Sequence, residues 1–430
     1  ECLADGRSIS LPALSAGLGK LATRSTGAYA RIRRQFKTPI GYFEGVEESL
    51  ARIIGSTYAI EAVRLMTAQA LDRGEKPSVI SAIAKYHCTE KMRRIINDAM
   101  DVFGGTAICL GPRNLLGSYY ESIPISITVE GANILTRSLI IFGQGLIRCH
   151  PFLLAEMKAL ADEDCDGGLR DFDKAFWGHF GFGISNMVRA FLLALGSGRL
   201  SRSPFKGRAG KYARQIVRLS SALALASDAA LLILGGNLKR QEKLSARLGD
   251  ILAQLYIASA ALKRFHDQGC PEKDEALLDW VCQDALFKAQ EQLACFLRNF
   301  PAPFLARALG FLIFPLGRRY HPPGDRLGGR MVGLFLEPTA ARDRLTGGIF
   351  ISTDDHDGLG RIEQAFQQQT SVAGIEKKAR NGLKERGLKP VNELELIDMA
   401  LNEKIIDQNE ELQLRAAYEA MLKAIAVDDF

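Results

Sequence analysis

Apolar residues recur at helical spacing along most of the chain, from Leu11 to Phe300. Side chains three or four residues apart share one face of an α-helix, so this spacing gives each helix an apolar stripe that must be buried. Of the 430 residues, 47% are hydrophobic, which is sufficient for two or three domains with cores of their own. The pattern therefore predicts an all-α globular protein.

Breaks in this pattern predict the helices of a first domain. A long amphipathic helix that includes Leu50 closes near Gly74 and Pro77, where a helix does not readily continue. A second helix runs from about Ser78 to Phe103 and ends at two glycines. After a loop rich in Gly, Pro and Asn, a last helix runs from about Asn133 to Ile147. Together they predict an antiparallel bundle of the four-helix type over residues 1–150.

The rest of the chain is predicted to hold further helices and no chemistry of its own. The acidic segment DEDCDGGLRDFD at 162–173 contains two adjacent glycines, which indicates a linker at about 151–170. A second helical domain is expected over 171–345. The composition turns polar near Asp354, so residues 346–430 are expected to form a tail of loosely packed surface helices.

The second helical domain is expected to repeat the first. The segment LARIIGSTYAIEAVRL at Leu50 aligns with LGDILAQLYIASAALKR at Leu248, although any two amphipathic helices can be slid into agreement. At the same offset the glycine pair meets Ala302 and Pro303, and Glu130 meets Gly328. A copy without the glycines and the acid is expected to serve packing or a partner.

Three short segments carry the chemical signal of the chain. They read RRQFKTPIGYFE at 33–44, AMDVFGGTAI at 99–108 and VEGANILTR at 129–137. Each has an ordinary explanation by itself: basic residues suit a helix C-terminus, a glycine pair ends a helix, and an acid suits a first helical turn. In this order and at this spacing they resemble the C-terminal helical domain of flavin-dependent acyl-CoA dehydrogenases.

The resemblance implies a role for the acid in the third segment. Glu130 would be the catalytic base that removes the α-proton of an acyl thioester, with Gly131 at the substrate. Burial against flavin and acyl chain is expected to raise the pKa of this carboxyl group toward the working pH. Arg7, in ECLADGRSISLPA, resembles an arginine that lies close to the base and the acyl-CoA.

The resemblance also implies contacts with flavin adenine dinucleotide. Arg33, Gln35 and Phe36 would reach the cofactor of a neighbouring subunit, with the guanidinium of Arg33 near the pyrophosphate. The remaining cofactor positions that the resemblance implies are Gly104, Gly105, Ala132 and Asn133. Three residues depart from the family pattern: Lys37 replaces a glycine, and Glu44 and Asp101 replace glutamines. Contacts at the adenine end are therefore in doubt, and Ala132 lacks the hydroxyl of the commoner threonine.

The match extends over nearly the whole chain to the large bacterial acyl-CoA dehydrogenases with a long C-terminal extension. It implies an FAD enzyme that converts fatty acyl-CoA to trans-2-enoyl-CoA in the first step of β-oxidation. The enzyme would be a homo-oligomer, a dimer, that passes electrons to an electron-transfer flavoprotein. Because the chain starts at Glu1 inside this domain, an N-terminal helical domain and a middle β-domain are expected to precede it, and the fragment alone is expected to be inactive.

Two alternatives remain open. A flavin-dependent acyl-CoA oxidase shares the fold and the base. A non-catalytic helical assembly or membrane-docking module is the alternative from another class. The segment at 300–320 has an apolar face that includes Leu309 and Leu312 and a basic end at Arg318 and Arg319, which suits a membrane interface and a buried helix equally.

Composition excludes several other classes. The net charge of +6 comes from 55 basic and 49 acidic residues that are interspersed, so no nucleic-acid partner is expected. The eight cysteines form no CxxC pair and the six histidines are scattered, which predicts a reducing compartment and no metal. No apolar run suggests a membrane span or a signal peptide. A cytoplasmic protein is expected, with a peripheral contact at the inner face of the cell membrane left open.

Overall fold

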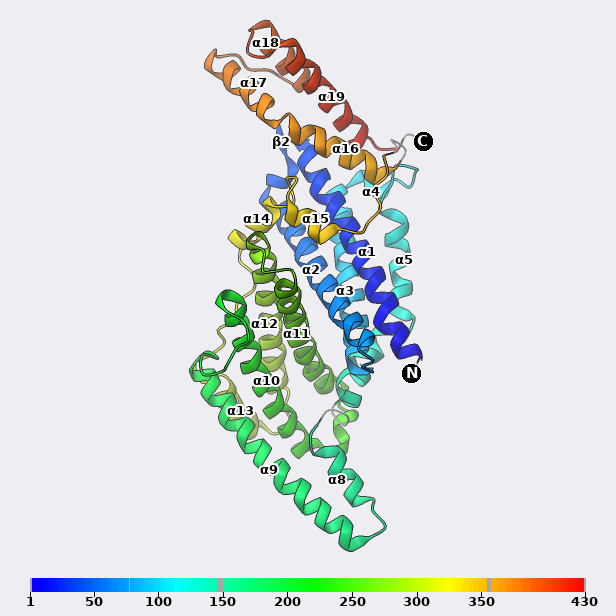
Figure 1. Cartoon of the computed structure of the whole chain (residues 1–430), viewed down its shortest axis with the longest axis vertical. Helices are drawn as coiled ribbons and strands as arrows, with labels where there is room; N and C mark the ends of the chain where they lie inside the picture. Colours follow the sequence, from blue (N-terminus) through cyan, green and yellow to red (C-terminus); the bar gives the residue numbers. More distant parts are fainter. Residues whose placement is uncertain (1, 77, 146–149, 354–356, 429–430) are drawn as a thin grey trace. The chain divides into compact units, whose positions relative to one another are not determined.

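The computed structural model describes residues 2–76, 78–145, 150–353 and 357–428, and this part of the chain is almost entirely helical (Figure 1). The predicted all-α class is confirmed. The first elements are α1 (Cys2–Ile32), β1 (Arg34–Gln35), β2 (Thr38–Pro39), η1 (Ile40–Tyr42), α2 (Glu44–Asp72), α3 (Ser78–Phe103), α4 (Gly105–Ile108), α5 (Gly117–Thr128), α6 (Asn133–Leu135) and the π-helix η2 (Thr136–Gln144).

The later elements are α8 (Leu153–Leu160), α9 (Cys165–Leu195), α10 (Gly207–Leu234), η3 (Gly235–Lys239), α11 (Glu242–Asp267), η4 (Glu272–Asp274), α12 (Glu275–Arg298) and α13 (Pro303–Ile313). They are followed by α14 (Asp325–Gly333), α15 (Ala340–Thr346), α16 (Gly358–Ser371), α17 (Ala373–Glu385), α18 (Glu393–Asn402) and α19 (Gln408–Ile425). Short antiparallel pairing of β1 with β2 is the one sheet in the described residues.

The predicted helices of the first bundle are present. The second predicted helix has the bounds of α3. The helix predicted around Leu50 is α2, and its first turn holds Glu44 and Glu47, where exposed N–H groups favour acids. The expected helix from Asn133 is α6 continued by η2, and its expected end at Ile147 lies outside the described residues, as does Pro77.

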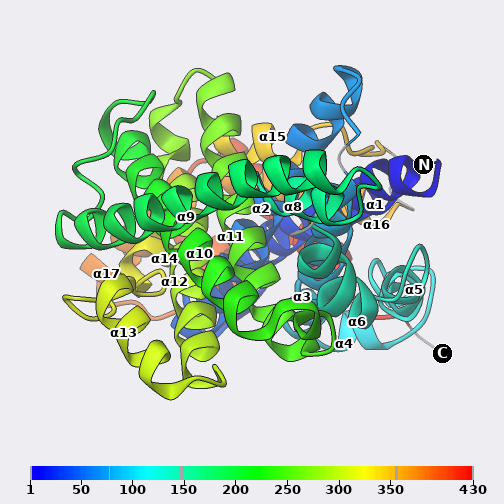
Figure 2. The ribbon, with the colours of Figure 1, turned by 90° about the horizontal axis from the view of Figure 1, so that it is seen from below.

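Contacts divide the chain into two compact units. Unit 1 comprises residues 1–16, 58–91 and 124–324, and unit 2 comprises 17–57, 92–123 and 325–430. Residues 1–150, expected as one domain, are thus shared between the units. In unit 1, α10, α11 and α12 pack together. Helix α9 lies along α10, and α8 lies beside the N-terminal half of α9 (Figures 1 and 2).

The segment predicted as a linker is helical. Residues 153–160 form α8, and α9 begins at Cys165. The side chain of Asp164 accepts a hydrogen bond from the backbone N–H of Asp166 and caps α9, and Asp166 lies in the first turn. Acidic residues that suggest a solvated linker are therefore the N-terminal signal of a long helix.

The tail is also more ordered than predicted. Helices α17, α18 and α19 of unit 2 enclose a core in which Leu383 and Ile397 are almost wholly buried. Side chains of Asn392 and Asp407 cap α18 and α19, and Asp407 with Glu410 forms a reciprocal capping box. The capping side chains accept hydrogen bonds from N–H groups of the first helical turn that would otherwise bond to water. Polar residues in this segment therefore accompany well-formed helices.

Helix starts support the predicted repeat. Each helix of a first series has a counterpart at a nearly constant distance along the sequence. The first series, α2, α3 and α4, begins at Glu44, Ser78 and Gly105, and the second, α11, α12 and α13, begins at Glu242, Glu275 and Pro303. The two series therefore have the same order of helices and nearly the same distances between helix starts. Sliding two unrelated helices into register does not produce this agreement.

One helix contradicts the expectation that no segment could span a membrane. The stretch Gly207–Lys239, which is α10 with η3, is long and apolar enough, and half of its most apolar window is buried in unit 1. The bent pair Gly117–Thr128 and Asn133–Gly143 also meets this criterion if taken together. A buried core helix meets this criterion as well.

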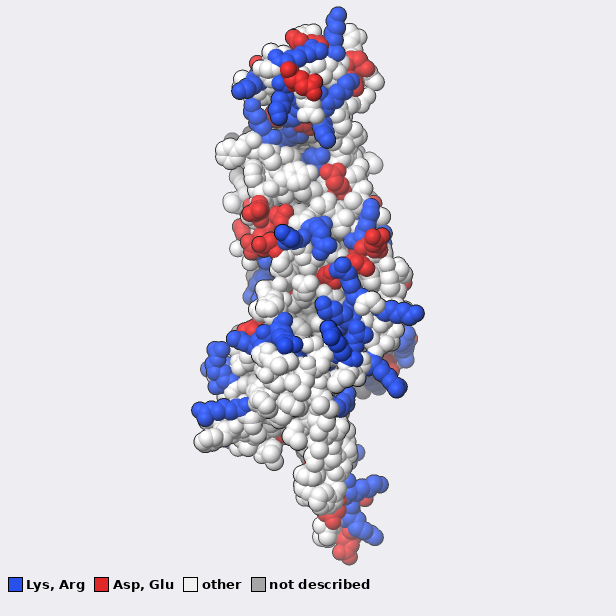
Figure 3. All heavy atoms as spheres, turned by 90° about the vertical axis from the view of Figure 1, so that its left-hand side faces the viewer, with Lys and Arg blue, Asp and Glu red and all other residues white. Residues whose placement is uncertain are grey.

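On the face in Figure 3, basic and acidic side chains are mixed, and a mostly uncharged stretch lies toward its lower end.

Candidate active site

The predicted base lies in a tight turn of unit 1, between the end of α5 at Thr128 and the start of α6 at Asn133. Glu130 has a φ of 53° and Gly131 a φ of 94°, so both adopt the left-handed region. Glycine takes this conformation freely, whereas for a glutamate it costs about 1–2 kcal/mol. Such strain persists only where the surrounding structure holds it, and it concentrates at functional sites.

Lys85 holds this turn. It lies on α3 with no exposed surface, and its ammonium donates to the carbonyl oxygens of Ile127 at 3.2 Å and Gly131 at 2.8 Å, and to Oδ1 of Asn133 at 2.7 Å. An ammonium has three protons, and each has an acceptor. Burial, with a smaller contribution from the charge of Arg7, lowers the pKa of Lys85 to about 8, although Glu130 and Glu90 oppose the shift.

Asn133 completes the support of the turn. Only 2% of it is exposed, and its amide nitrogen donates to Oγ1 of Thr89 at 3.0 Å and Oε1 of Glu90 at 2.8 Å. Both amide hydrogens are thus used inside unit 1. The cofactor contact that the resemblance implies for Asn133 stays a prediction, with the backbone of Asn133 as the part whose atoms are not engaged in these two side-chain bonds. Ala132 beside it is the N-cap of α6 and has no side-chain cap.

The two carboxylate oxygens of Glu130 have different surroundings. Oγ of Ser10, on α1, lies 3.0 Å from Oε1 and 2.8 Å from the carbonyl oxygen of Gly6, so its one proton is shared between two acceptors. Oε2 is buried and has no hydrogen-bond partner in the described residues. A buried unpaired oxygen costs about 1–3 kcal/mol and calls for an explanation, such as a ligand that supplies the missing proton.

Arg7, on α1, shows the same feature. Its Nε is buried and has no hydrogen-bond partner among the described residues, and its charge acts on Lys85. Unit 1 therefore holds an unpaired buried acceptor on Glu130 and an unpaired buried donor on Arg7. A ligand that offers a weakly acidic proton and an oxygen acceptor would match both groups.

The predicted glycine pair belongs to unit 2. Gly104 has a φ of 61° directly after α3, and its N–H bonds the carbonyl oxygen of Met100 at 2.8 Å, so it ends the helix as a C-cap. A Cβ atom added at Gly104 or Gly105 would meet nothing within 4 Å. Gly104 therefore meets a backbone requirement, and both glycines leave open space beside the chain, which suits close approach of a cofactor.

The segment with Arg33, Gln35 and Phe36 forms the β1–β2 hairpin of unit 2. Phe36 and Lys37 have φ values of 50° and 62°, as in the two-residue turns typical of hairpins, and Phe36 is 91% exposed. An aromatic ring held that far into solvent suits a contact with another molecule. The adjacent Arg34 is engaged instead within unit 2, because its two guanidinium nitrogens donate to Glu376 at 2.6 and 2.7 Å.

One group of possible metal ligands occurs in the described residues, formed by His150, His179 and Asp228 of unit 1. Nδ1 of His150 accepts from the backbone N–H groups of Phe152 at 3.3 Å and Leu153 at 3.1 Å. A neutral imidazole then carries its proton on Nε2, which lies 3.2 Å from Asp228 and donates to it. Neither nitrogen of His150 is left to bind a metal in this arrangement, in which His150 is hydrogen-bonded to Asp228 and His179 is hydrogen-bonded to Glu156.

Sequence reasoning missed two groups of the site, Lys85 and Ser10. A lysine inside the apolar run SAIAKYH is the signal that could have drawn attention to Lys85, because lysine is rarely fully buried without partners. Ser10 has no comparable signal. Its role depends on a turn that lies far along the chain.

Two family models match the sequence in tandem. Residues 2–142 match acyl-CoA dehydrogenase, C-terminal domain, and residues 147–430 match acyl-CoA dehydrogenase, C-terminal, bacterial type. The chain is 25% identical over 297 residues to the probable acyl-CoA dehydrogenase FadE10 of Mycobacterium tuberculosis, covering 66% of this chain and 44% of that protein. It is 32% identical over 105 residues to a 3-(aryl)acrylate reductase of Clostridium sporogenes, covering 24% of this chain and 28% of that protein. The chain spans less than half the length of these curated relatives.

A solved structure shares the fold. An acyl-CoA dehydrogenase of Bacillus anthracis complexed with FAD matches with a TM-score of 0.60 and 17% identity, covering 78% of this chain and 56% of that chain. The likeness in fold extends across both family-model matches, because it includes more of this chain than either model alone.

Proposed function

The chain belongs to the acyl-CoA dehydrogenase family, and on that premise we propose that Glu130 is the base of an α,β-dehydrogenation of acyl-CoA thioesters. The observation that carries the proposal is the carboxylate oxygen Oε2, which is buried, unpaired among the described residues and presented by a strained turn. A carboxylate with one oxygen anchored and the other without a partner is ready to accept a proton from a bound substrate.

The residues of unit 1 divide the work of the proton transfer. Oε2 of Glu130 takes the α-proton of the thioester, while Ser10 at 3.0 Å orients the carboxylate through Oε1. Nε of Arg7 donates to an oxygen of the acyl-CoA, which places positive charge beside the developing enolate. Lys85 acts through the backbone, because its bonds to Ile127 and Gly131 fix the carbonyl groups on both sides of Glu130.

FAD is the cofactor that completes the reaction in this proposal. When bound, FAD accepts the hydride that leaves the β-carbon as the double bond of the trans-2-enoyl-CoA forms. Unit 2 fits the group: the open space beside Gly104 and Gly105 admits it, and the exposed Phe36 and the half-buried Arg33 would meet the FAD of a neighbouring subunit in a homo-oligomer. Backbone atoms of Gly131 and Ala132 would lie beside FAD and substrate.

The cellular role is proposed from family membership. We place the reaction in fatty-acid β-oxidation, with an electron-transfer flavoprotein as acceptor, and the protein in the cytoplasm. The free thiols of Cys88, Cys109, Cys165, Cys270, Cys282 and Cys295 support a reducing compartment. A peripheral contact with the inner face of the membrane is part of the proposal. Leu309 of the expected docking face is buried, with 3% exposed, so the support comes from Phe304 and Phe311 of α13, which are 83% and 64% exposed.

Glu130→Gln tests the proposal in the full-length protein loaded with FAD. The amide keeps the shape of the carboxylate and has negligible proton affinity, so dehydrogenation should fall by about a hundredfold to ten-thousandfold. Flavin absorbance should stay unchanged. Glu121→Gln, an exposed acid on α5, is the matched control. Near-normal turnover by Glu130→Gln would refute the assignment, and hydrogen peroxide formed in air at the rate of turnover would identify an oxidase.

A further inference from the structure

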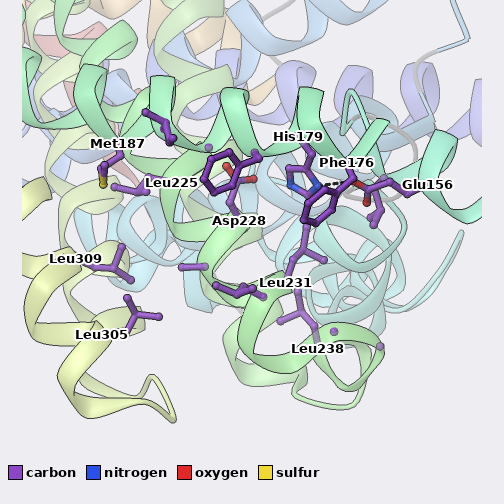
Figure 4. Close-up of a pocket in the computed structure, with 18 of the residues that line it drawn as sticks. Glu156, Phe176, His179, Met187, Leu225, Asp228, Leu231, Leu238, Leu305 and Leu309 are labelled. Carbon is purple, nitrogen blue, oxygen red and sulfur yellow. Dashed lines mark hydrogen bonds and ion pairs between the residues drawn. The ribbon is translucent and has the colours of Figure 1, made fainter. Parts of the chain in front are cut away.

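A second site of a different kind lies in unit 1, among α8, α9, α10 and α13 (Figure 4). It is a cavity of about 830 Å³, in the range of small-molecule sites. No residue of the Glu130 turn lines it. Its walls are mostly aliphatic and aromatic, and four polar side chains line it: Glu156, His179, Asp228 and Lys239.

The cavity is polar at one end and apolar at the other. Figure 4 shows Glu156 and His179 at one end, Met187, Leu305 and Leu309 at the opposite end, and Asp228 between them. His179 and Met187 both face the cavity from α9, and the helical rise separates them by about 12 Å. A ligand that fills this space therefore has a polar head and an extended hydrocarbon tail.

Hydrogen bonds at the polar end leave acceptors in excess. Nδ1 of His179 lies 2.8 Å from Oε1 of Glu156, so it donates to that carboxylate and leaves Nε2 as an acceptor in the neutral ring. Asp228 already accepts from His150 at 3.2 Å and from Nδ2 of Asn186 at 3.3 Å. Two carboxylates and a ring nitrogen therefore face the head of a ligand.

This arrangement selects against anions. The carboxylates of Glu156 and Asp228 are mostly shielded from solvent, with 13% and 14% of the side chains exposed, so their charges repel a bound carboxylate or phosphate strongly. The cation in the lining, Lys239, is exposed, so water and salt screen its charge. A head that donates hydrogen bonds and carries no negative charge satisfies the acceptors.

The apolar walls argue for an occupant as well. Phe176, Phe180 and Ile184 line the cavity from α9, yet they are 45%, 56% and 45% exposed, and Leu232 of α10 is 80% exposed. A hydrocarbon chain laid along these side chains would remove apolar surface from water on both sides. Binding would gain with every methylene group buried.

We propose that this cavity binds a single-chain lipid whose head donates hydrogen bonds and has no negative charge, of the class of long-chain alcohols and monoacylglycerols. The tail lies between α9 and α13, and the head hydroxyl donates to Nε2 of His179 beside Glu156. The site is independent of the chemistry at Glu130, so it stands whether or not that residue is a base.

Titration of the full chain with hexanol, octanol and decanol tests the proposal. Trp177 is a built-in reporter, because it is 65% exposed and packs against Phe176 and Phe180 with ring centroids 5.6 and 5.9 Å apart. Affinity should rise about fourfold per added methylene until the cavity is filled. Octanoate should bind at least about tenfold more weakly than octanol, because its charge meets two carboxylates.

A matched pair of glycines on α9 shows where the ligand lies. A side chain at Gly183, which lines the cavity, or at Gly181, which does not, meets nothing within 4 Å. Gly183→Leu should occupy part of the cavity and weaken octanol binding by about tenfold or more, as expected for two displaced methylenes, while Gly181→Leu should bind octanol like the parent. Equal melting temperatures of the two variants exclude unfolding as the cause.

Glu156→Gln tests the head-group argument and should narrow the preference for octanol over octanoate. The proposal is overturned if affinity does not depend on chain length, if Gly183→Leu and Gly181→Leu bind equally, or if octanoate binds the parent chain as well as octanol. Tighter binding of octanoate would indicate that Lys239 holds the head and that the carboxylates do not select it.

Discussion

Replacement of Lys85 by methionine is the sharpest test of how the site is built. Methionine keeps the length of the side chain and removes the ammonium, so the buried Oδ1 of Asn133 and the carbonyl oxygen of Ile127 lose this donor, and the carbonyl oxygen of Gly131 keeps the hydroxyl of Thr136. Each unsatisfied acceptor costs about 1–3 kcal/mol. Relief of the buried charge in the variant offsets about 3.5 kcal/mol of this loss, because the pKa of Lys85 is lowered from 10.5 to about 8 and each pKa unit is worth about 1.4 kcal/mol.

The pH dependence gives this prediction its sign. The folded protein holds the Lys85 proton less tightly than the unfolded chain, so the contribution of Lys85 to stability rises between pH 8 and pH 10.5 and is lost as the pH falls back through 8. Across this window the free energy of unfolding of the parent minus that of Lys85→Met should grow by up to about 3.5 kcal/mol. The difference isolates Lys85 from other groups that titrate in both proteins.

Urea unfolding followed by circular dichroism at several pH values measures this difference. Lys158→Met, at an exposed lysine of α8, is the control and should show no such trend. Near pH 7 the variant should be less stable by about 3 kcal/mol, the balance of lost hydrogen bonds and relieved burial. A difference that stays flat with pH, or a variant as stable as the control, would show that Lys85 is not a buried ammonium in this turn.

Three further predictions follow. Arg33→Ala should release FAD from the full-length protein without unfolding unit 2. Arg34→Ala should instead destabilise unit 2 by about 2 kcal/mol, because the charged pair with Glu376 is lost. Measurements of flavin content and of urea unfolding distinguish the two effects. Gly104→Ala should cost about 1–2 kcal/mol because its φ of 61° is left-handed, and Gly105→Ala should cost less. If α13 contacts lipid, Phe304→Asp with Phe311→Asp should abolish co-sedimentation with anionic vesicles at an unchanged melting temperature; retained co-sedimentation would remove α13 from the proposal.

The helices were predictable because their signals are local. The bounds of α3 follow from apolar spacing and a terminal glycine, and the capping pattern of Asp407 and Glu410 was present in the sequence although the tail was expected to be loose. The start of α9 shows the limit, since acidic residues near Asp164 fit a linker and a helix N-terminus equally until the hydrogen bond to Asp166 is seen.

The candidate site was only partly predictable because its supports are not local. Glu130, Gly131 and Arg7 could be named from motifs, but whether Arg33 or Arg34 is engaged in an ion pair depends on Glu376, which is distant in sequence. The resemblance implied a cofactor contact for Asn133 but not the hydrogen bonds that its side-chain amide donates to Thr89 and Glu90. Partners of this kind are set by packing, which motif spacing does not record.

In the Glu130 turn, the group that fixes the backbone is not the group that the proposed reaction uses. Ile127 and Gly131 flank Glu130, and one ammonium binds both of their carbonyl oxygens, so the backbone of the turn is fixed without any bond to the unpaired Oε2 of Glu130. A point charge with three protons suits three converging acceptors, whereas the planar fork of arginine does not. Lys85→Arg should therefore fail to restore what Lys85→Met loses. If Glu130 is the base that we propose, a displacement of about 1 Å would lower the rate by about a hundredfold although its carboxylate is intact.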